Sequence, residues 1–360
     1  MGDLTDYNDT LAFFRGKKVF LTGHTGFKGS WLTYLLLELG AIVKGYALNP
    51  DLYSHYELLN ISKKIIDIRA DIRDARQLED EIRDFEPDIV IHLAAQALVR
   101  KSYDNARETF ETNLMGSVNL LEAVKRCESI RSLVFITSDK CNENVEWIWG
   151  YRENDALGGH DPYSASKAAA EIAFSSYSRS FFSSRSNLGV ASARAGNVIG
   201  GGDWSADRII PDCIRAAKSD SKLILRNPNS TRPWQHVLEP LSGYLMLGYY
   251  LYRNPESYSG SWNFGPDTSN HKTVYQVATK IIKSIGSGSI EIDKAGSEFH
   301  EARLLQLNCD KAHQSLGWLP RWDADKSIDM TADWYRRYLL GEQVADITKM
   351  QLLEYFKELK

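Results

Sequence analysis

The chain has 360 residues, of which 43% are hydrophobic and 25% charged, and its formal net charge at pH 7 is −4. This length predicts one large α/β domain, or one domain with a smaller lobe. The slightly acidic balance excludes a bulk attraction to nucleic acid or to an anionic membrane surface. No apolar run reaches the roughly 18 residues of a membrane span, and the acidic N-terminus does not resemble a signal peptide. We therefore expect a cytoplasmic protein with no nucleic-acid or membrane partner.

Short apolar runs alternate with amphipathic stretches through the first half of the chain. This alternation predicts a parallel sheet covered by helices on both faces, and right-handed connections favour a doubly wound Rossmann sheet. The expected strands are Lys18–Thr22, Ile42–Ala47, Ile65–Ile68, Asp88–Leu93, Leu133–Thr137 and Gly189–Ala193. The expected helices between them are Phe27–Leu39, Asp74–Phe85 and one long helix that ends at Cys127.

The alternation stops near Asn197, where a glycine-rich loop is followed by short elements and frequent prolines. We expect residues 1–196 to form the Rossmann domain. Residues 197–360 are expected to form mainly a smaller substrate-binding lobe that is interleaved with it. The four cysteines form no C-x-x-C pair and the eight histidines show no metal-ligand spacing, so we expect free thiols and no metal site.

A glycine-rich turn lies where the first expected strand meets the first expected helix. Gly23-x-x-Gly26-x-x-Gly29 has the spacing of a dinucleotide fingerprint, in which glycines let a diphosphate approach the backbone N–H groups of a helix start. Small or acidic residues also follow the third and fourth strands, and the pattern predicts a NAD site. The residues expected to hold the cofactor are Gly23, Thr25, Gly26, Phe27, Lys28, Asp71, Ile72, Leu93, Ala94, Ala95, Gln96, Tyr163 and Lys167.

The acidic residue that binds a ribose in NAD proteins is expected about 20 residues after the glycines. Here the second strand runs into a loop in which Asn49 or Asp51 must serve. His24 and Lys28 add positive charge to the glycine turn, which leaves NADP as an alternative cofactor.

Tyr163 and Lys167 are four residues apart and project from one face of a helix. An ammonium beside a phenol favours the phenolate, so Tyr163 can exchange protons. Ser138, Asp139 and Lys140 follow the fifth strand and supply more acid–base groups than one hydride transfer needs. We therefore predict a nucleotide-cofactor enzyme that oxidises its substrate and then changes it further.

These motifs resemble those of the extended short-chain dehydrogenase/reductases that act on nucleotide-sugars, over about residues 16 to 320. Longer strings narrow the resemblance to the members that dehydrate CDP-glucose. The strings are Ile136-Thr-Ser-Asp-Lys-Cys141, Trp149-Gly-Tyr-Arg-Glu153, Gly158-Gly-His-Asp-Pro-Tyr163, Arg194-Ala-Gly-Asn-Val-Ile-Gly-Gly-Gly-Asp-Trp204 and Arg232-Pro-Trp-Gln-His-Val-Leu-Glu-Pro240.

The resemblance implies an internal redox cycle in which NAD+ oxidises C4 of the glucosyl group, water is lost across C5–C6, and the hydride returns to C6. It implies that Tyr163, with its pKa lowered by Lys167, is the acid–base group at C4 and that Ser138 binds the C4 oxygen. Asp139 would protonate the departing C6 hydroxyl, which requires that burial raise its pKa. The implied pathway is dideoxysugar synthesis for a bacterial O-antigen.

Lys140 stands where related dTDP-sugar dehydratases have the Glu that removes the C5 proton. It is that base only if its surroundings lower its pKa; otherwise it stabilises the enolate and another group is the base. The resemblance also implies a homodimer or homotetramer paired through helices at about 104–127 and 162–181. The implied substrate-binding residues are Asn197, Arg208, Arg232, His236 and Glu301, with the guanidinium groups suited to a diphosphate.

Three alternatives accompany this interpretation. Another nucleotide-hexose 4,6-dehydratase, acting on a dTDP, GDP or UDP sugar, would use the same catalytic residues. A 4-epimerase needs only the Ser, Tyr and Lys, so Asp139 and Lys140 argue against it. A redox sensor that binds NAD(P) without turnover usually lacks the Tyr or the Lys.

Overall fold

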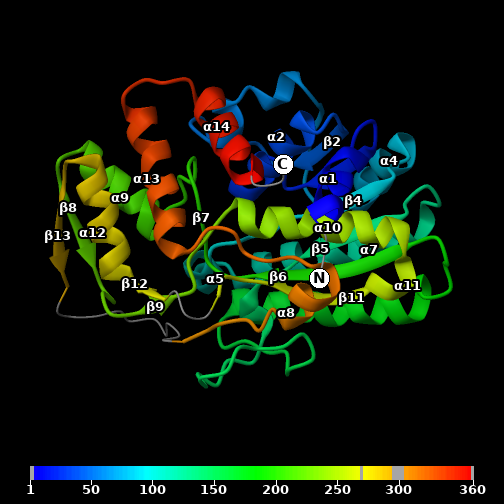
Figure 1. Cartoon of the computed structure of the whole chain (residues 1–360). Helices are drawn as coiled ribbons and strands as arrows, with labels where there is room; N and C mark the ends of the chain where they lie inside the picture. Colours follow the sequence, from blue (N-terminus) through cyan, green and yellow to red (C-terminus); the bar gives the residue numbers. More distant parts are fainter. Residues whose placement is uncertain (1–3, 268–270, 294–303, 358–360) are drawn as a thin grey trace.

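A seven-stranded, fully parallel sheet forms the centre of the molecule (Figure 1). The computed structural model describes residues 4–267, 271–293 and 304–357. The strand order is β11-β6-β5-β4-β1-β2-β3. Successive strands are added on one side of β1 as far as β3 and then, from β4 on, on its other side. This is the doubly wound order that the sequence predicts. The strands are β1 (Lys18–Thr22), β2 (Ile42–Ala47), β3 (Ile66–Arg69), β4 (Ile89–His92), β5 (Ser132–Ile136), β6 (Gly189–Ala195) and β11 (Gly260–Phe264).

The six predicted strands are confirmed, and β1 and β2 have the predicted bounds. The seventh strand, β11, was not predicted. It comes from the second half of the chain and pairs with β6 at the edge of the sheet, with Trp262 opposite Ala193. A five-residue run that stands apart from the regular strand–helix alternation gives too weak a local signal.

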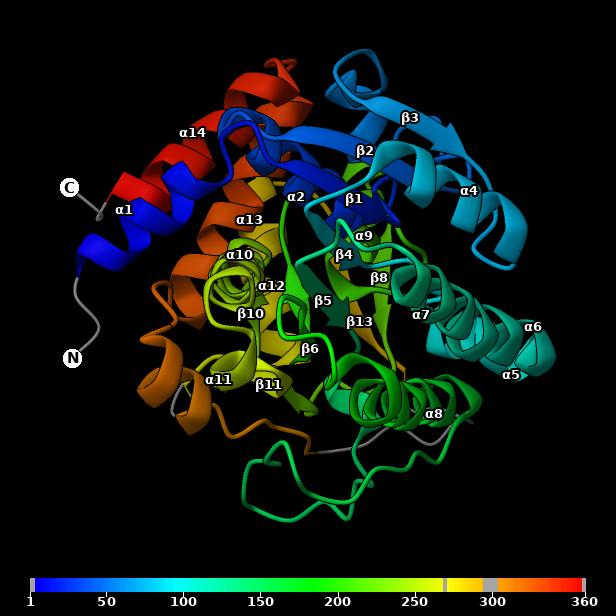
Figure 2. The ribbon, with the colours of Figure 1, turned by 90° about the vertical axis from the view of Figure 1, so that its right-hand side faces the viewer.

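Helices cover both faces of the sheet because successive strand residues point to opposite sides. In β5, Leu133 and Phe135 pack with α4, α7 and α8, whereas Val134 and Ile136 pack with α2 and α10. Figure 2 shows these two helical layers on either side of the strands. The layer helices are α2 (Phe27–Glu38), α4 (Ala75–Phe85), α7 (Gly116–Arg126), α8 (Pro162–Tyr177) and α10 (Leu238–Arg253), and α1 (Leu4–Phe13) lies against α10.

The long helix predicted to end at Cys127 is confirmed, since residues 106–126 are helical without interruption. The segment forms α5 (Val99–Asp104), α6 (Ala106–Phe110), a π-helical turn (Glu111–Met115) and α7. Asn105 separates α5 from α6 with φ −132° and ψ 56°, outside the helical region.

A smaller lobe lies beside the sheet, on the left of Figure 1. Its two-stranded parallel pair, β8 with β13, accompanies α9, α12 and α13, and α12 packs on both of the other helices. Short pairs, β7 with β10 and β9 with β12, lie between the larger elements. The bounds are β7 (Val198–Ile199), α9 (Ile209–Lys218), β8 (Lys222–Leu225), β9 (Thr231–Arg232), β10 (Gln235–His236), α11 (Pro255–Tyr258), β12 (Lys272–Thr273), α12 (Val274–Ile285), β13 (Ser289–Ile292), α13 (Ala324–Leu339) and α14 (Val344–Phe356).

Three properties of the described residues bear on the classes of protein considered. None of their helices has the length and apolar character needed to cross a membrane. Their four cysteines are buried free thiols, as predicted. Within the same residues, no cluster of three metal-ligating side chains is present.

Candidate active site

The glycine turn sits between β1 and α2 and presses against the end of β4. Gly23 has φ +74°, and a Cβ there would lie 2.7 Å from the amide nitrogen of Ala94. A Cβ on Gly29 would lie 2.1 Å from the Gly23 carbonyl oxygen. Both positions therefore require glycine, since no side chain fits without moving the backbone.

The start of α2 offers an anion site. Gly26 precedes helix α2 and provides no side chain to cap it. The first turn of the helix has no acidic residue. Its first backbone N–H groups are therefore without a side-chain partner, and the helix dipole favours a negative charge there. The glycine cradle and the uncapped helix start fit the diphosphate of a dinucleotide.

The residues that the sequence predicts to be catalytic lie where strand β5 ends and helix α8 begins. Asp161 caps α8 and Pro162 opens it, so Tyr163 and Lys167 lie on one face, and both are buried. Ser138 directly follows the Thr137 that ends the predicted fifth strand, and its hydroxyl lies close enough to act on the pKa of Tyr163. Its hydroxyl also donates to Oδ1 of Asp139 at 2.9 Å.

Burial sets the proton affinities of these groups. The pKa of the Asp139 carboxyl is raised because the side chain is buried, although Lys140, Ser138 and Lys28 act in the opposite direction. A pKa raised by burial is the condition that the predicted role of Asp139 as a proton donor requires. Burial also lowers the pKa of Lys167 to about 8.

The expectation that Lys167 lowers the pKa of Tyr163 is wrong for this structure. Burial raises the pKa of Tyr163 to about 12, and the nearby Ser138 hydroxyl and the charge of Arg208 act in the opposite direction. The phenol is therefore neutral near pH 7, and proton transfer from it depends on the groups around it.

Lys28 joins this cluster from the first turn of α2. Burial lowers its pKa to about 8, with the nearby charges of Arg208 and Lys167 acting in the same direction and that of Asp139 in the other. The sequence assigned Lys28 to the cofactor alone. Its closeness to Asp139 was missed because Lys28 lies at the start of α2 and Asp139 follows β5, and only the folded sheet brings these two segments together.

Comparison with known proteins identifies the family. A family described as GDP-mannose 4,6 dehydratase matches residues 20–331. The CDP-glucose 4,6-dehydratase of Salmonella typhimurium is 47% identical over 348 residues, which cover 95% of this chain and 97% of that protein. The chain belongs to this family of extended short-chain dehydrogenase/reductases.

More distantly related proteins also match this chain over most of its length. The dTDP-glucose 4,6-dehydratase of Streptomyces antibioticus is 27% identical, with 88% of this chain and 92% of that protein covered. A solved UDP-glucose 4-epimerase of Thermus thermophilus in complex with NAD is 26% identical, with a TM-score of 0.75 and coverage of 89% and 99%. An epimerase of Methanothermobacter thermautotrophicus, 24% identical with a TM-score of 0.81 and coverage of 94% and 97%, shares the fold.

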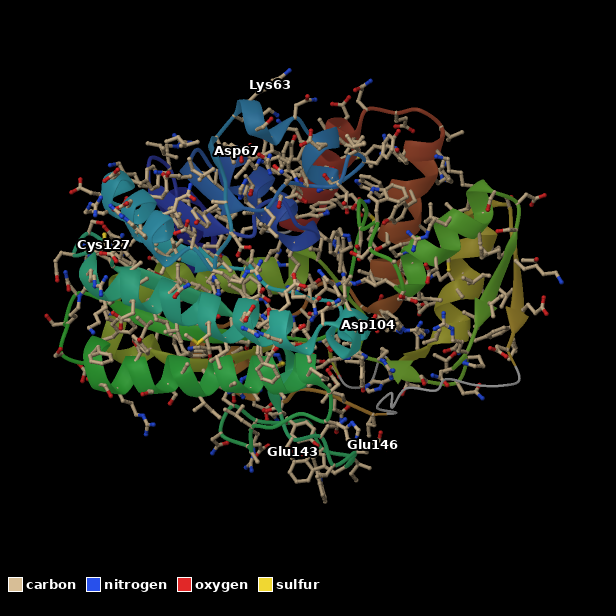
Figure 3. All side chains as sticks on the ribbon, turned by 180° about the vertical axis from the view of Figure 1, so that it is seen from behind. Lys63, Asp67, Asp104, Cys127, Glu143 and Glu146 are labelled. Carbon is tan, nitrogen blue, oxygen red and sulfur yellow. The ribbon has the colours of Figure 1, made fainter. Side chains whose placement is uncertain are left out.

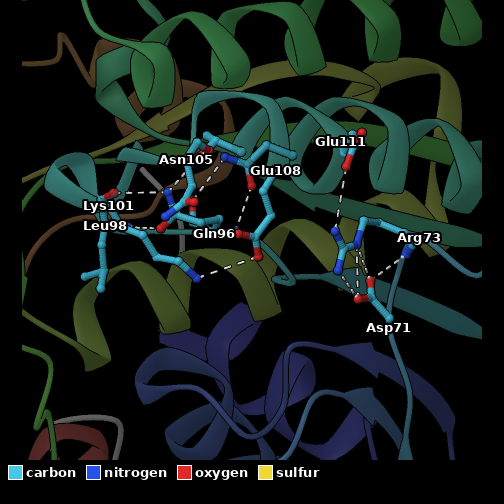
Figure 4. Close-up of polar contacts among 10 residues, drawn as sticks. Asp71, Arg73, Gln96, Leu98, Lys101, Asn105, Glu108 and Glu111 are labelled. Carbon is cyan, nitrogen blue, oxygen red and sulfur yellow. Dashed lines mark hydrogen bonds and ion pairs between the residues drawn. The ribbon is translucent and has the colours of Figure 1, made fainter. Parts of the chain in front are cut away.

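Several residues predicted to bind the cofactor already make contacts within the protein (Figure 4). The Asp71 carboxylate pairs with Arg73 at 2.6 Å, and this lowers its pKa. The Ile72 side chain is buried where a Cβ on Gly116 would meet it at 2.6 Å. The Gln96 amide bonds Leu98 and Thr109 at 2.7–3.1 Å and so holds the turn after β4.

The remaining cofactor positions lie at strand ends. Thr25 donates to the Leu48 carbonyl oxygen at 3.1 Å, next to the exposed Asn49 and Asp51. Thr22 accepts from the backbone N–H groups of Leu93 and Ala94, both at 3.2 Å. Phe27 packs close to Gly200, where a Cβ would lie 3.2 Å from its ring. Ala95 is half-buried at the same edge of the sheet.

The positive charge expected from His24 is not present at the glycine turn. Its ring is fully buried over Gly45, where a Cβ would come within 2.5 Å of it, and its Nε2 pairs with Asp67 at 2.8 Å. Burial lowers the pKa of His24, so the ring is neutral near pH 7. Lys28 brings a cation to this turn, and Arg208 lies close enough to act on it.

The predicted substrate-binding residues have different positions. Arg208 pairs with Asp203 at 2.9 Å and lies within electrostatic reach of Tyr163. Asn197 follows β6, and its carbonyl oxygen accepts from the Gln235 N–H at 3.3 Å. Arg232 lies in β9 and donates to the Thr231 carbonyl oxygen at 2.9 Å.

One predicted substrate contact, His236, does not lie at the site. His236 is fully buried, its ring packs 4.9 Å from that of Trp322, and burial lowers its pKa to about 3. It is a neutral core residue with no surface to offer a ligand. Glu301 lies outside the described residues. His271 and Gln306, which sequence reasoning did not single out, line a cavity beside Asp139.

Proposed function

We propose that this protein is a lyase that converts CDP-D-glucose to CDP-4-dehydro-6-deoxy-D-glucose and water with NAD as its cofactor. The observation that carries the proposal is Asp139, a buried carboxyl with a raised pKa that is bonded to Ser138 beside Tyr163. An epimerase has no use for a proton donor at this place. The 47% identity to a CDP-glucose 4,6-dehydratase supports both the reaction and the nucleotide.

Each catalytic side chain has one task in this proposal. NAD, when bound, accepts a hydride from C4 and returns it to C6. Tyr163 is a neutral phenol near pH 7, so it takes the proton of the C4 hydroxyl through the small phenolate fraction that Arg208 and Ser138 favour, and Ser138 also hydrogen-bonds the C4 oxygen. Lys167 holds the nicotinamide ribose and Asp139 gives its proton to the C6 oxygen as the C6–O bond breaks.

Two lysines are candidates for the group that removes the C5 proton. Lys140 and Lys28 both lie within electrostatic reach of Asp139. A lysine acts as a base only when it is deprotonated, and the lowered pKa of Lys28 makes that form accessible near pH 8. If Lys28 is the base, Lys140 stabilises the enolate. If Lys140 is the base, Lys28 binds the diphosphate.

The proposal extends to the substrate's diphosphate and to the assembly. Arg208, Arg232 and Asn197 would hold the diphosphate, since guanidinium groups bind it through paired hydrogen bonds. The protein would act in the cytoplasm as a homodimer or homotetramer, in dideoxysugar synthesis for an O-antigen. Residues 1–196 would carry the cofactor and 197–360 mainly the substrate.

A panel of substrates tests the activity. The purified protein is incubated with NAD+ and, separately, CDP-glucose, dTDP-glucose, UDP-glucose or GDP-mannose. The alkaline absorbance of a 4-keto sugar and a mass loss of one water report the product. We expect turnover of CDP-glucose alone. Turnover of another sugar would overturn the cytidine assignment, and an isomer without water loss would establish an epimerase.

A further inference from the structure

A small cavity lies against Asp139 where β6 and β11 end. Its volume is about 10 Å³, which is the room of about one water molecule. Asp139, His271 and Gln306 provide its polar lining, and Pro233, Pro266 and Gly196 are among its other walls. A cavity of this size beside a proton donor suits a single oxygen atom.

The two oxygens of Asp139 have different neighbours. Oδ1 accepts the hydrogen bond from Ser138 at 2.9 Å. Oδ2 lies on the other side, where a Cβ on Gly196 would come within 2.9 Å of it and within 3.7 Å of the Pro233 ring. The missing side chain at Gly196 therefore keeps the space beside Oδ2 open.

His271 faces this cavity from a fixed backbone. The next residue, Lys272, pairs with Arg232 in the β9–β12 ladder, and its carbonyl oxygen accepts from the Trp234 indole at 2.9 Å. Among the described residues, Nε2 of His271 is buried and has no hydrogen-bond partner. A buried ring nitrogen left in this state is costly, so the cavity calls for a polar guest.

Gln306 supplies a third polar group. Its side-chain nitrogen donates to the Ile148 carbonyl oxygen at 2.6 Å, and its backbone oxygen accepts from the Tyr151 N–H at 2.9 Å. The side-chain oxygen is the group that remains for a guest. With Asp139 and His271, it gives the two to four polar partners that an enclosed water takes.

We propose that this cavity receives the C6 oxygen of the hexose and holds it as the released water, with His271 as its positioning partner. The proposal rests on the dehydratase activity proposed above. In the elimination, the base removes the C5 proton and the C5–H electron pair forms the C5=C6 double bond. The C6–O bond breaks with its electron pair on oxygen, which takes the Asp139 proton. Asp139 is left as a carboxylate and the water stays between it and His271.

Single-turnover kinetics with enzyme in excess over CDP-glucose test this role, because NADH exists only between C4 oxidation and hydride return. In His271→Leu, which removes the polar atom but keeps a similar bulk, NADH should form at the wild-type rate. It should then persist about tenfold longer, which is the effect of one lost hydrogen bond. His271→Gln, which restores a polar atom, should recover most of the elimination rate.

His313→Leu is the matched control. His313 is also half-buried, and its Nε2 also lacks a hydrogen-bond partner among the described residues, but it stacks on Trp318 and does not line the cavity. The inference is overturned if His271→Leu releases water as fast as His313→Leu, or if it slows C4 oxidation as much as elimination. A wild-type protein that releases no water from any nucleotide-sugar overturns the proposed function itself, before any variant is compared.

Discussion

At the scale of single residues, the proposed role of Asp139 as a proton donor is what would separate a dehydratase from an epimerase. Asp139→Asn keeps the shape and the bond to Ser138 but removes the acidic proton. We expect C4 oxidation to continue and water loss to fall by about 10²–10⁴-fold, the usual contribution of a general acid. Transient NADH absorbance and the mass of the product measure the two steps. Asp80→Asn, at an exposed carboxylate paired with Arg83, should change neither; equal losses in both steps would contradict the assignment.

The lysines of the site predict a pH dependence. Burial lowers the pKa of Lys167 to about 8. Its charged form is present below that pH and is lost as the pH rises through it. Because kcat/KM reports the free enzyme, it should decline above about pH 8. Lys28 has a similar pKa, but as the C5 base it would act in its uncharged form and would give a rising limb through the same pH, so a decline that Lys28→Met retains belongs to Lys167. A profile flat to pH 10 would exclude both.

At the scale of elements, the β1–α2 turn depends on Gly23 for two reasons. Gly23→Ala forces a left-handed conformation on a residue with a side chain and drives its Cβ against the Ala94 backbone. Gly16→Ala is a matched control, since Gly16 has φ +73° with nothing within 4 Å of a Cβ. We expect Gly16→Ala to lose about 1–2 kcal/mol of stability and to bind NAD normally. Gly23→Ala should lose more stability and its NAD binding, as measured by urea unfolding and calorimetry.

The contact of α8 with β6 contains a buried ion pair behind the catalytic residues. Glu171, one turn after Lys167, pairs with Arg194 at 3.0 Å, and both side chains are 2% exposed. Thr137 and Ser192 also donate to Glu171, at 2.5 and 2.9 Å. The network ties the helix of Tyr163 to the strands on either side of the site.

Removing one partner of this pair leaves an uncompensated buried charge. Glu171→Leu should therefore lower the free energy of unfolding by about 3–5 kcal/mol. The double variant Glu171→Leu/Arg194→Met should be closer to the wild type than the single variant, because neither charge remains. Urea unfolding of the single and double variants measures both. Additive losses would show that the ion pair does not govern this contact.

At the scale of the whole molecule, α8 and the α5–α7 run lie side by side on one face. Figure 3 shows the run from Asp104 to Cys127 beside α8. Ile172 on α8 is 59% exposed and Met115 is 50% exposed, which suits a face that a second subunit covers. Ile172→Glu should convert the assembly to monomers in light scattering. Ile224→Glu, at a 60% exposed residue of β8 in the lobe, should leave it intact. A monomeric wild type would contradict the proposed assembly.

The catalytic roles of Ser138, Asp139, Tyr163 and Lys167 stay predictions that the family resemblance implies. The sequence by itself determined the six strands, the glycine turn and the helix that carries Tyr163 and Lys167. These features follow from alternation, helical spacing and the residues that a tight turn requires, all of which are local. Tertiary structure decided the rest. It placed β11 at the sheet edge, buried His236 and His24 as neutral rings, and brought Lys28 and His271 to Asp139. Burial and proximity come from contacts between distant segments, and the direction of each pKa shift depends on both.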